Sequence, residues 1–500
     1  LVARDAFNGV ILWKKPMKKW HSHLWPLKSG PTQLARRLVA VKDRVYITLG
    51  VDEPVSVLDA ATGELIHELP GSKGAEEIIV EGGQVFVLES PEEWELNSFL
   101  PFHNTGDQAR IRRDFAWNKK KRDVKAYDSV TGKRIWGHNN KVAPLTMTAD
   151  EHRVFFHDGE KVVALNRSSG DVAWSAGKSF LPETVRFNFG PKLVIHDGVV
   201  LYAGGDRTMK AIDAKTGKQL WEAPHARGGY QSPEDLLVMR GMVWSAPTTS
   251  GRDSGIFTGR DLRTGKVMIE IPPNVDTYWF HHRCYIAKAT DNFLMPSRTG
   301  IEFIDPETKN WDINHWVRGG CLYGVMPANG LTYAPPHNCA CYPEAKLFGF
   351  NALASASPSR ALGKVIEANR LERGPAFGQA TDAAGNGESD WPTYRHDNLR
   401  SGFSNNRVGD KLVEKWATKL EGKLSAVTIA ENKLFVARVD AHEVVALHAE
   451  TGKELWRFTT GGRVDSPPSI HDGRAYFGSA DGWVYCLRAR DGALVWRFRA

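Results

Sequence analysis

Short runs in which apolar and polar residues alternate recur along the chain, and many come in pairs separated by a polar or glycine turn. Residues 38–47, 78–87 and 193–202 are clear examples. A period of two is typical of β-strands with one buried face. A short turn between two such runs predicts a β-hairpin. The pattern therefore predicts an all-β protein.

A second phrase follows most hairpins: a strand, a tight turn closed by glycine, and then a tryptophan on the next strand. Glycine supplies the positive φ that other residues resist, and tryptophan is large enough to pack between neighbouring units. Clear copies end at Trp13, Trp136, Trp174, Trp221, Trp456 and Trp496, and weaker copies cover residues 59–67, 261–269 and 305–311.

Hairpin and turn phrase together make four antiparallel strands, and most copies lie roughly 40 to 50 residues apart, which suits the blade of a β-propeller. We expect an eight-bladed propeller of four-stranded blades at 1–353, with an incomplete first blade. Residues 354–390 are small and polar and read as a linker, and 391–500 read as the first two blades of a second propeller. The alternative is one ring in which the last blades complete the first.

Two insertions interrupt the repeat, at residues 14–35 and 89–123. Long blade insertions usually decorate one face and often carry function, although a packing flap without chemistry fits equally well. The chain opens inside a repeat without an initiator methionine, so we expect a fragment truncated at both ends.

Charge, hydropathy and motifs give no sign of nucleic-acid binding, a membrane-spanning helix or hydrolysis. The formal net charge is +7, and its densest patch, residues 119–122, reads as a solvated loop because no basic stripe with interleaved aromatics follows it. We therefore expect no nucleic-acid partner. No apolar run reaches the length of about 18 residues that a transmembrane helix needs. No nucleophile elbow, paired-carboxylate helix or phosphate loop points to hydrolysis.

The turn phrases resemble the pyrroloquinoline-quinone (PQQ) repeat family of β-propellers. Residues 210–221 and 444–456 look like the tryptophan-docking motif of that family, and 391–402 look like the segment that opens many of its propellers. The resemblance covers nearly the whole chain. It implies either a quinoprotein alcohol or sugar dehydrogenase that uses PQQ and calcium, or a BamB-type scaffold that binds envelope proteins without a cofactor. Either implies a periplasmic or otherwise extracytoplasmic location.

The chain departs from the dehydrogenase pattern. Quinoprotein alcohol dehydrogenases carry two adjacent cysteines, whereas here one residue separates Cys339 from Cys341. No Cys-x-x-Cys-His haem motif is present. No catalytic aspartate with calcium-binding glutamate and asparagine can be matched residue by residue.

A candidate ligand site follows from propeller geometry, because the residues that lead into the first strand of each blade surround one mouth of the central channel. These residues are Arg36, Arg37, Glu76, Glu77, Asn188, Gln231, His282, Arg283 and Arg318. Arginine forks suit carboxylate, phosphate or sulfate groups, so the set predicts a small anionic ligand. Alternatively, the residues pair with one another around trapped water. Glu77 and Asn188 offer oxygens to calcium, but two are too few for a site.

A second constellation gathers cysteines and histidine: Cys284, Cys321, His337, Cys339 and Cys341. Disulfides, a Cys/His metal site and buried thiols all remain open. Cys-x-Cys is not the usual zinc spacing, and an oxidising compartment, which the resemblance implies, permits disulfides. We expect at least one bridge and assign no metal. Cys486 should be a buried thiol.

Two hypotheses of function follow. The first is a ligand- or protein-binding scaffold of the cell envelope. The second is a PQQ-dependent oxidoreductase. An enzyme needs at least three oxygen ligands for calcium and a nearby carboxylate base, whereas a scaffold needs an exposed apolar or aromatic rim.

Overall fold

The fold is known from a computed structural model. It describes residues 1–18, 36–50, 52–90, 121–143, 145–178, 192–204, 207–225, 236–245, 255–274, 285–296, 300–314, 316–319, 324–336, 347, 349–356, 367–379, 387 and 389–500. By contacts the chain divides into two compact units, Leu1–Ser355 and Ala356–Ala500. Within the described ranges, no helix is long and apolar enough to cross a membrane.

The described part of the first unit contains eight antiparallel sheets, and six of them have four strands that follow one another in chain order. The sheets consist of β1 (Val2–Arg4) and β2 (Ile11–Lys14); β3 (Leu38–Val41), β4 (Arg44–Thr48), β5 (Val55–Asp59) and β6 (Leu65–Glu68); β7 (Ala75–Glu81), β8 (Gln84–Glu89), β9 (Lys121–Asp128) and β10 (Arg134–Lys141); β11 (Thr148–Ala149), β12 (Arg153–His157), β13 (Val162–Asn166) and β14 (Val172–Ala176); β15 (Lys192–His196), β16 (Val199–Ala203), β17 (Thr208–Asp213) and β18 (Gln219–Pro224); β19 (Leu237–Met239), β20 (Met242–Ser245), β21 (Phe257–Asp261) and β22 (Val267–Ile271); β23 (Lys288–Ala289), β24 (Leu294–Met295), β25 (Ile301–Ile304) and β26 (Trp311–Asn314); and β27 (Met326–Ala328), β28 (Leu331–Ala334) and β29 (Asn351–Ala354).

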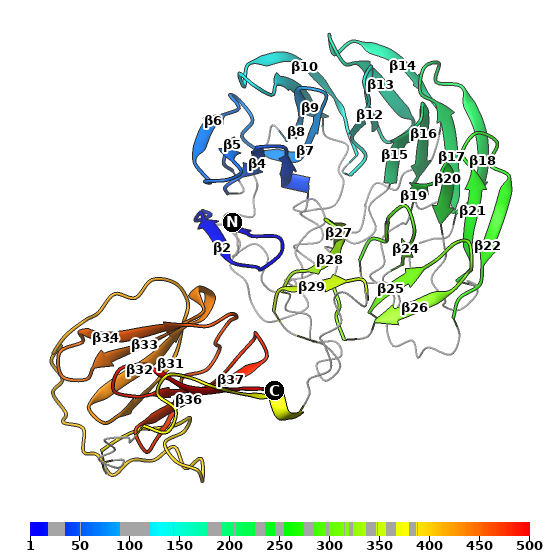
Figure 1. The fold of residues 1–500 in the computed structure, drawn as a ribbon. Coiled ribbons are helices and arrows are strands. Elements are labelled where there is room, and N and C mark those ends of the chain that lie inside the picture. The colour runs from blue at the N-terminus through cyan, green and yellow to red at the C-terminus, as the bar shows by residue number, and fades with distance from the viewer. Residues whose placement is uncertain are drawn as a thin grey trace. The chain divides into compact units, whose positions relative to one another are not determined.

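These sheets stand around a common centre (Figure 1). The first strands of successive sheets touch one another, as in the pairs β3 and β7, β7 and β11, and β23 and β27, so the first strand of each of these sheets is the innermost. The guanidinium of Arg4 lies over the ring of Phe350, 5.9 Å from its centre, and joins the first sheet to the last. The predicted eight-bladed propeller is confirmed, with two strands described in its first blade and three in its last.

The hydrophobic core lies between the sheets. One cluster includes Val57 and Tyr46 from one sheet with Ile78 and Val87 from the next. Comparable clusters fill the following spaces around the ring. Because each strand turns alternate residues to opposite faces, one blade contributes side chains to two such clusters, which explains the alternating pattern of the sequence.

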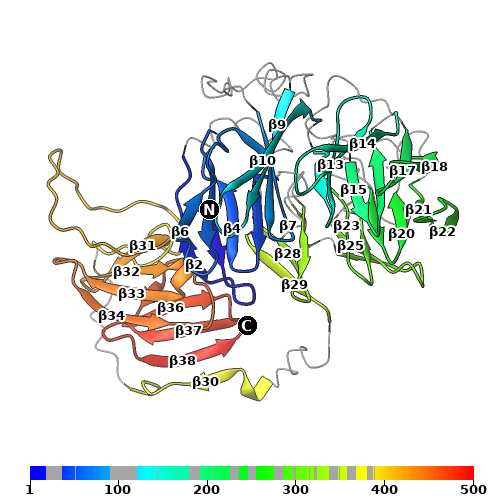
Figure 2. The same cartoon turned by 90° about the horizontal axis from the view of Figure 1, so that it is seen from above.

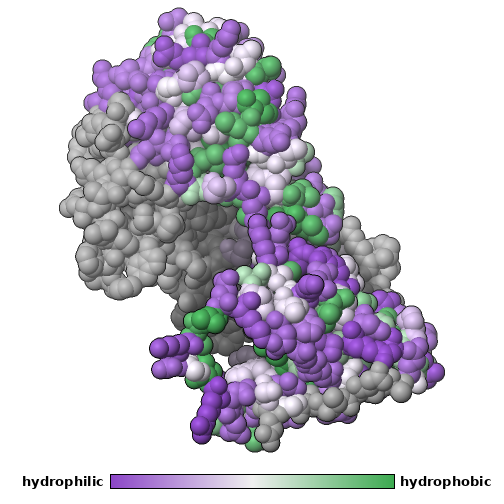
Figure 3. All heavy atoms as spheres, turned by 90° about the vertical axis from the view of Figure 1, so that its left-hand side faces the viewer, coloured by the Kyte–Doolittle hydropathy of each residue, from purple (hydrophilic) through white to green (hydrophobic). Residues whose placement is uncertain are grey.

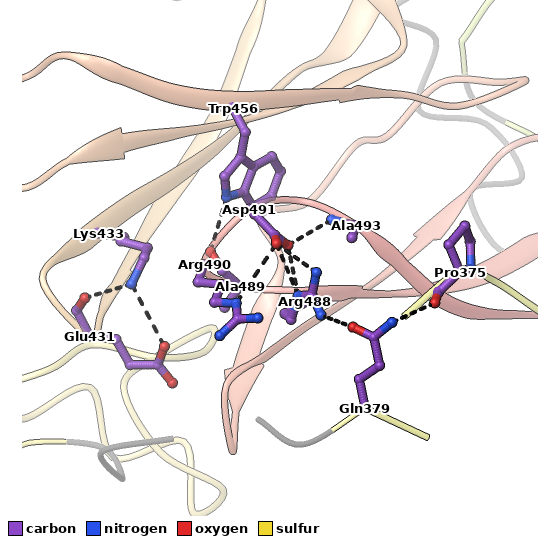
Figure 4. A network of polar contacts seen from close by, with 10 residues as sticks. All are labelled: Pro375, Gln379, Glu431, Lys433, Trp456, Arg488, Ala489, Arg490, Asp491 and Ala493. Carbon is purple, nitrogen blue, oxygen red and sulfur yellow. Dashed lines mark hydrogen bonds and ion pairs between the residues drawn. The ribbon is translucent and has the colours of Figure 1, made fainter. Parts of the chain in front are cut away.

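The tryptophans of the turn phrase make a recurrent contact, which we call the docking joint. The indole lies against the turn glycine of the next sheet, and its Nε1–H donates to the carbonyl of the residue that begins the turn; Figure 4 shows this bond from Trp456 to Ala489. The other described pairs, at 2.7 to 3.0 Å, are Trp13 with Ala60, Trp136 with Arg167, Trp174 with Ala214, and Trp221 with Leu262. Trp416, which follows no turn phrase, makes the same bond to Ala449 at 2.9 Å.

The second unit, described by itself, packs two sheets face to face (Figure 2). Their strands are β31 (Leu424–Ala430), β32 (Lys433–Arg438), β33 (Glu443–His448) and β34 (Glu454–Thr459), and β35 (Ser469–His471), β36 (Arg474–Ser479), β37 (Trp483–Arg488) and β38 (Leu494–Arg499). Residues 391 and 392 bond to the first strand of each sheet. Trp391 pairs with Ile429 of β31, and the Pro392 carbonyl accepts from the N–H of Ile470 on β35. Two short 3-10 turns, Glu367–Asn369 and Val439–Ala441, complete the unit.

The segment predicted to be a linker, 354–390, contains a strand. β30 (Leu371–Arg373) pairs with β38 and adds a fifth strand to the outer edge of its sheet. Glu372 accepts a hydrogen bond from Arg497 at 2.7 Å, and Gln379 contacts Arg488 (Figure 4). All three residues of β30 are exposed, so the strand has no alternating apolar pattern by which the sequence could reveal it.

Candidate functional site

Two adjacent glutamates stand at the head of the innermost strand β7, and both are buried. Ala75 pairs with Glu89 and Glu77 with Leu88, so Glu76 is the extra residue of a β-bulge. A bulge breaks the strict alternation of side chains and re-aims them. It therefore allows both carboxylates to turn into the protein at one end of the strand.

Each glutamate meets a guanidinium. Arg36, just before β3 in the preceding sheet, contacts Glu77. Arg122, on the third strand β9, donates from Nε to Glu76 at 2.6 Å. Arg122 belongs to the basic patch that was predicted to be a solvated loop, and for this residue that prediction is wrong, because it lies buried inside the blade. The two pairs thus fasten the head of β7 to β3 and to β9.

Arg37 is the most deeply buried cation of this set, with a residue exposure of 1%. Burial lowers its pKa to about 10, and the negative charges of Glu76 and Asp52 partly offset the effect. Arg37 still carries its charge at neutral pH. The cost of burying that charge is offset by nearby carboxylates.

Burial raises the pKa of Glu77, the charge of Arg36 opposes this rise, and Glu76 adds to it. Lys192 also lowers the pKa of Glu77, although it comes from β15, two sheets further on. Lys192 is buried as the first residue of its inner strand. Lys192 was not among the predicted mouth residues, although the apolar run that starts at Leu193 directly follows it.

The structure brings Arg36, Arg37, Glu76 and Glu77 together. Arg318 is buried in the connection between β26 and β27. The other mouth residues, Asn188, Gln231, His282 and Arg283, lie outside the described residues, as do Cys284, Cys321, His337, Cys339 and Cys341. Cys486 is the expected buried thiol, and burial raises its pKa to about 11.

We name the set Arg36, Arg37, Glu76, Glu77, Arg122 and Lys192 the mouth cluster. Its carboxylates hold guanidinium groups, so its plainest physical role is to clamp neighbouring blades at the inner end. Calcium requires several oxygen ligands that are free to coordinate it. Within the described ranges no group of three or more His, Cys, Asp or Glu side chains could hold a metal. The described residues therefore do not fit calcium-bound PQQ.

The same end of the ring also carries exposed apolar side chains. The fourth strand β26 ends at Asn314, and Trp316, two residues later, is 66% exposed. Met326, the first residue of the inner strand β27, is 65% exposed. The face drawn in Figure 3 is mostly hydrophilic with small separate hydrophobic patches. Exposed aromatic and methionine side chains are typical of contact surfaces.

Comparison with known proteins places this geometry in context. The profile of one protein family, described as outer membrane protein assembly factor BamB, matches residues 120–275 and 400–500, just over half of the chain. The BamB of Burkholderia pseudomallei is 26% identical over 261 residues, which are 46% of this chain and 63% of that protein.

A quinohemoprotein alcohol dehydrogenase of Comamonas testosteroni is 24% identical over 510 residues, covering 92% of this chain and 62% of that protein. The chain thus spans less than two thirds of the length of these curated relatives. The solved structure of BamB from Moraxella catarrhalis is 12% identical and covers 77% of this chain and 91% of its own, with a TM-score of 0.31, which adds nothing to the assignment.

Proposed function

Because the chain belongs to the PQQ-like repeat family of outer membrane protein assembly factor BamB, we propose that it is a protein-binding scaffold of the cell envelope. The name of these relatives describes proteins that act in outer membrane protein assembly. An extracytoplasmic location goes with that role and would permit the expected disulfide.

The proposal rests on the ion pairs that the two glutamates of the mouth cluster make. Glu76 and Glu77, at the head of the inner strand β7, are each held by an arginine. A cofactor site would need such oxygens for a metal, whereas a scaffold needs them only to fix its blades. The exposed Trp316 and Met326 then supply an apolar rim at the same end. A small anion held by Arg318 and neighbouring mouth residues is compatible with this role.

The second candidate is a PQQ-dependent oxidoreductase. It is favoured by the quinohemoprotein alcohol dehydrogenase, whose alignment covers 92% of this chain. Against it stand the separated Cys339 and Cys341 and the lack of a calcium donor set among the described residues.

A cross-linking experiment tests the scaffold. A photo-reactive amino acid replaces Trp316 in one variant and Val130 in a control. Val130 is matched in exposure at 65%, but it lies in the β9–β10 turn, at the far end of its blade. In envelope extracts, position 316 should capture defined outer membrane assembly proteins and position 130 should not. Equal capture at both positions, or dye reduction by the purified chain after PQQ and calcium are added, would overturn the proposal.

A further inference from the structure

One docking joint of the propeller has a histidine in place of the tryptophan. In the joint between the sheet β3–β6 and the sheet β7–β10, His67 occupies the tryptophan position. Its ring lies against the turn glycine in the same way: a Cβ on Gly132 would be 2.5 Å from His67 Cδ2. The corresponding distance is 2.6 Å for Gly170 and the ring of Trp136. His67 therefore fills the socket that an indole fills elsewhere.

The hydrogen bond of this joint comes from a different residue. At the tryptophan joints the indole N–H donates to the carbonyl of the residue that begins the next turn, and the corresponding carbonyl here is that of Ser129. The guanidinium of Arg44, on β4, donates to this carbonyl instead, and the Tyr46 hydroxyl lies 3.5 Å from it. In this joint the neutral indole donor is therefore replaced by the positively charged guanidinium of Arg44, which lies beside the imidazole of His67.

The surroundings of His67 favour its neutral form. Its Nε2 is buried without a hydrogen-bond partner. The charged residues of the elements packed around it are Arg44 on β4, Asp59, Glu64 and Glu68 around the β5–β6 turn and on β6, and Asp128, Lys133 and Arg134 around the facing β9–β10 turn. Burial first, and then the charge of Arg44, lower the pKa of His67. The carboxylate of Asp128 is engaged by its own turn, where it accepts from the Val130 and Thr131 N–H groups at 3.1 and 2.7 Å.

We propose that the joint between the sheets β3–β6 and β7–β10 is acid-sensitive, and that it loosens when His67 takes up a proton. The imidazolium would then stand beside Arg44 with its buried Nε2–H unsatisfied, and both effects favour an open joint. Six described joints in the chain use indole groups, which do not titrate. At the inner end of the same two sheets the pair Arg36–Glu77 stays in place, so opening starts from the outer edge.

The direction of the pH effect follows from linkage. A histidine whose pKa is lower in the folded state binds protons better when its site is open. The joint is therefore fully stable above the ordinary histidine pKa of about 6.5, and it weakens as pH falls through that value toward the lower pKa of the closed state. Each unit by which closure lowers the pKa corresponds to about a tenfold larger open population at acid pH.

Hydrogen–deuterium exchange of the full chain tests this proposal. Exchange at pH 7.5 and 5.5, corrected for the intrinsic rate, is compared for residues 127–136 at this joint and 208–221 at the Trp174–Gly217 joint. The parent should open several-fold more at pH 5.5 at the first joint and equally at the second. The neutral variant His67→Gln should lose the pH response, and Arg44→Gln, which removes the charge that lowers the pKa of His67, should weaken it.

The control joint shows whether a variant has folded, because its protection must equal that of the parent. His67→Trp, which restores the residue of the other joints, provides a second variant if His67→Gln unfolds, and it too should lose the response. An equal pH response in the parent and in a folded His67 variant would overturn the proposal. So would a response that Arg44→Gln leaves undiminished.

Discussion

The docking joint of Trp221 allows a quantitative test of what holds the blades together. Trp221 is 8% exposed, and its Nε1–H donates to the Leu262 carbonyl at 2.9 Å. Trp221→Ala removes the buried ring and leaves that carbonyl without its donor. Substitutions of buried tryptophan by alanine cost about 3–5 kcal/mol, of which the hydrogen bond accounts for about 1 kcal/mol. We expect a loss of this size in the free energy of unfolding of the propeller.

Substitution of the turn glycine that faces Trp221 gives a second measurement. A Cβ on Gly265 would lie 2.6 Å from Trp221 Cδ2, and the φ of Gly265 is 70°. Gly265→Ala therefore suffers both a clash and the left-handed backbone, which by itself costs roughly 1–2 kcal/mol. Gly241 is the matched control: its φ is also 70°, but a Cβ there would meet nothing within 4 Å. Gly241→Ala measures the backbone cost alone.

The two substitutions, Trp221→Ala and Gly265→Ala, combine in a double-mutant cycle. In the Trp221→Ala background the clash disappears, so Gly265→Ala should cost no more than Gly241→Ala does in the parent. Urea unfolding followed by far-ultraviolet circular dichroism gives the free energies from the midpoint and the slope, with the first unit analysed as its own transition. Additive effects of the two substitutions, or a change near zero for Trp221→Ala, would refute the docking joint as the source of stability.

Two further predictions concern the channel mouth and the cysteines. Arg318→Ala should weaken sulfate or carboxylate binding, measured by calorimetry, by about 1.5–3 kcal/mol, since that is the contribution of a hydrogen bond to a charged group; unchanged affinity would leave the mouth without an anion site. Among the four clustered cysteines, at least two should have Cα atoms within about 7 Å and appear as a bridged pair when unreduced peptides are analysed by mass spectrometry; four alkylated thiols would exclude the bridge, and the residues concerned are Cys284, Cys321, Cys339 and Cys341.

The propeller could be predicted because its determinants are local. The alternation of a strand, the turn glycine and the following tryptophan lie within a few residues of one another, so each copy reports its own blade. Even the weak copy at 305–311 forms its turn, where Lys309 takes the glycine position with a φ of 60°. Its N–H still bonds back to the Asp305 carbonyl. Because these local signals repeat along the chain, together they predict the whole propeller.

The candidate site was predicted only in part, because its contacts are not local. Arg36 and Glu77 could be grouped from the sequence because both lead into inner strands, and the structure shows them in contact. Arg122 was missed because its partner depends on a β-bulge at Glu76 and on a third strand, and neither feature has a sequence period. Lys192 was missed because the start of β15 decides which residue faces Glu77, and strand boundaries are the least certain part of a pattern.

The docking joints also show why a repeat can lose its signature residues and keep its place in the ring. What a joint requires is a flat or compact group against the next turn and, where a carbonyl is presented, a donor for it. His67 with Arg44 meets both needs by two side chains from two strands. At another joint Ile269 takes the tryptophan position and packs against a cluster that includes Leu294 and Ile304 of the following sheet. Different side chains can therefore fill the outer joints, although these side chains differ in their chemistry. The choice of an ionisable group at one joint alters how the ring responds to pH without altering its fold, and it does so at the two sheets that carry Arg36 and Glu77 at their inner end.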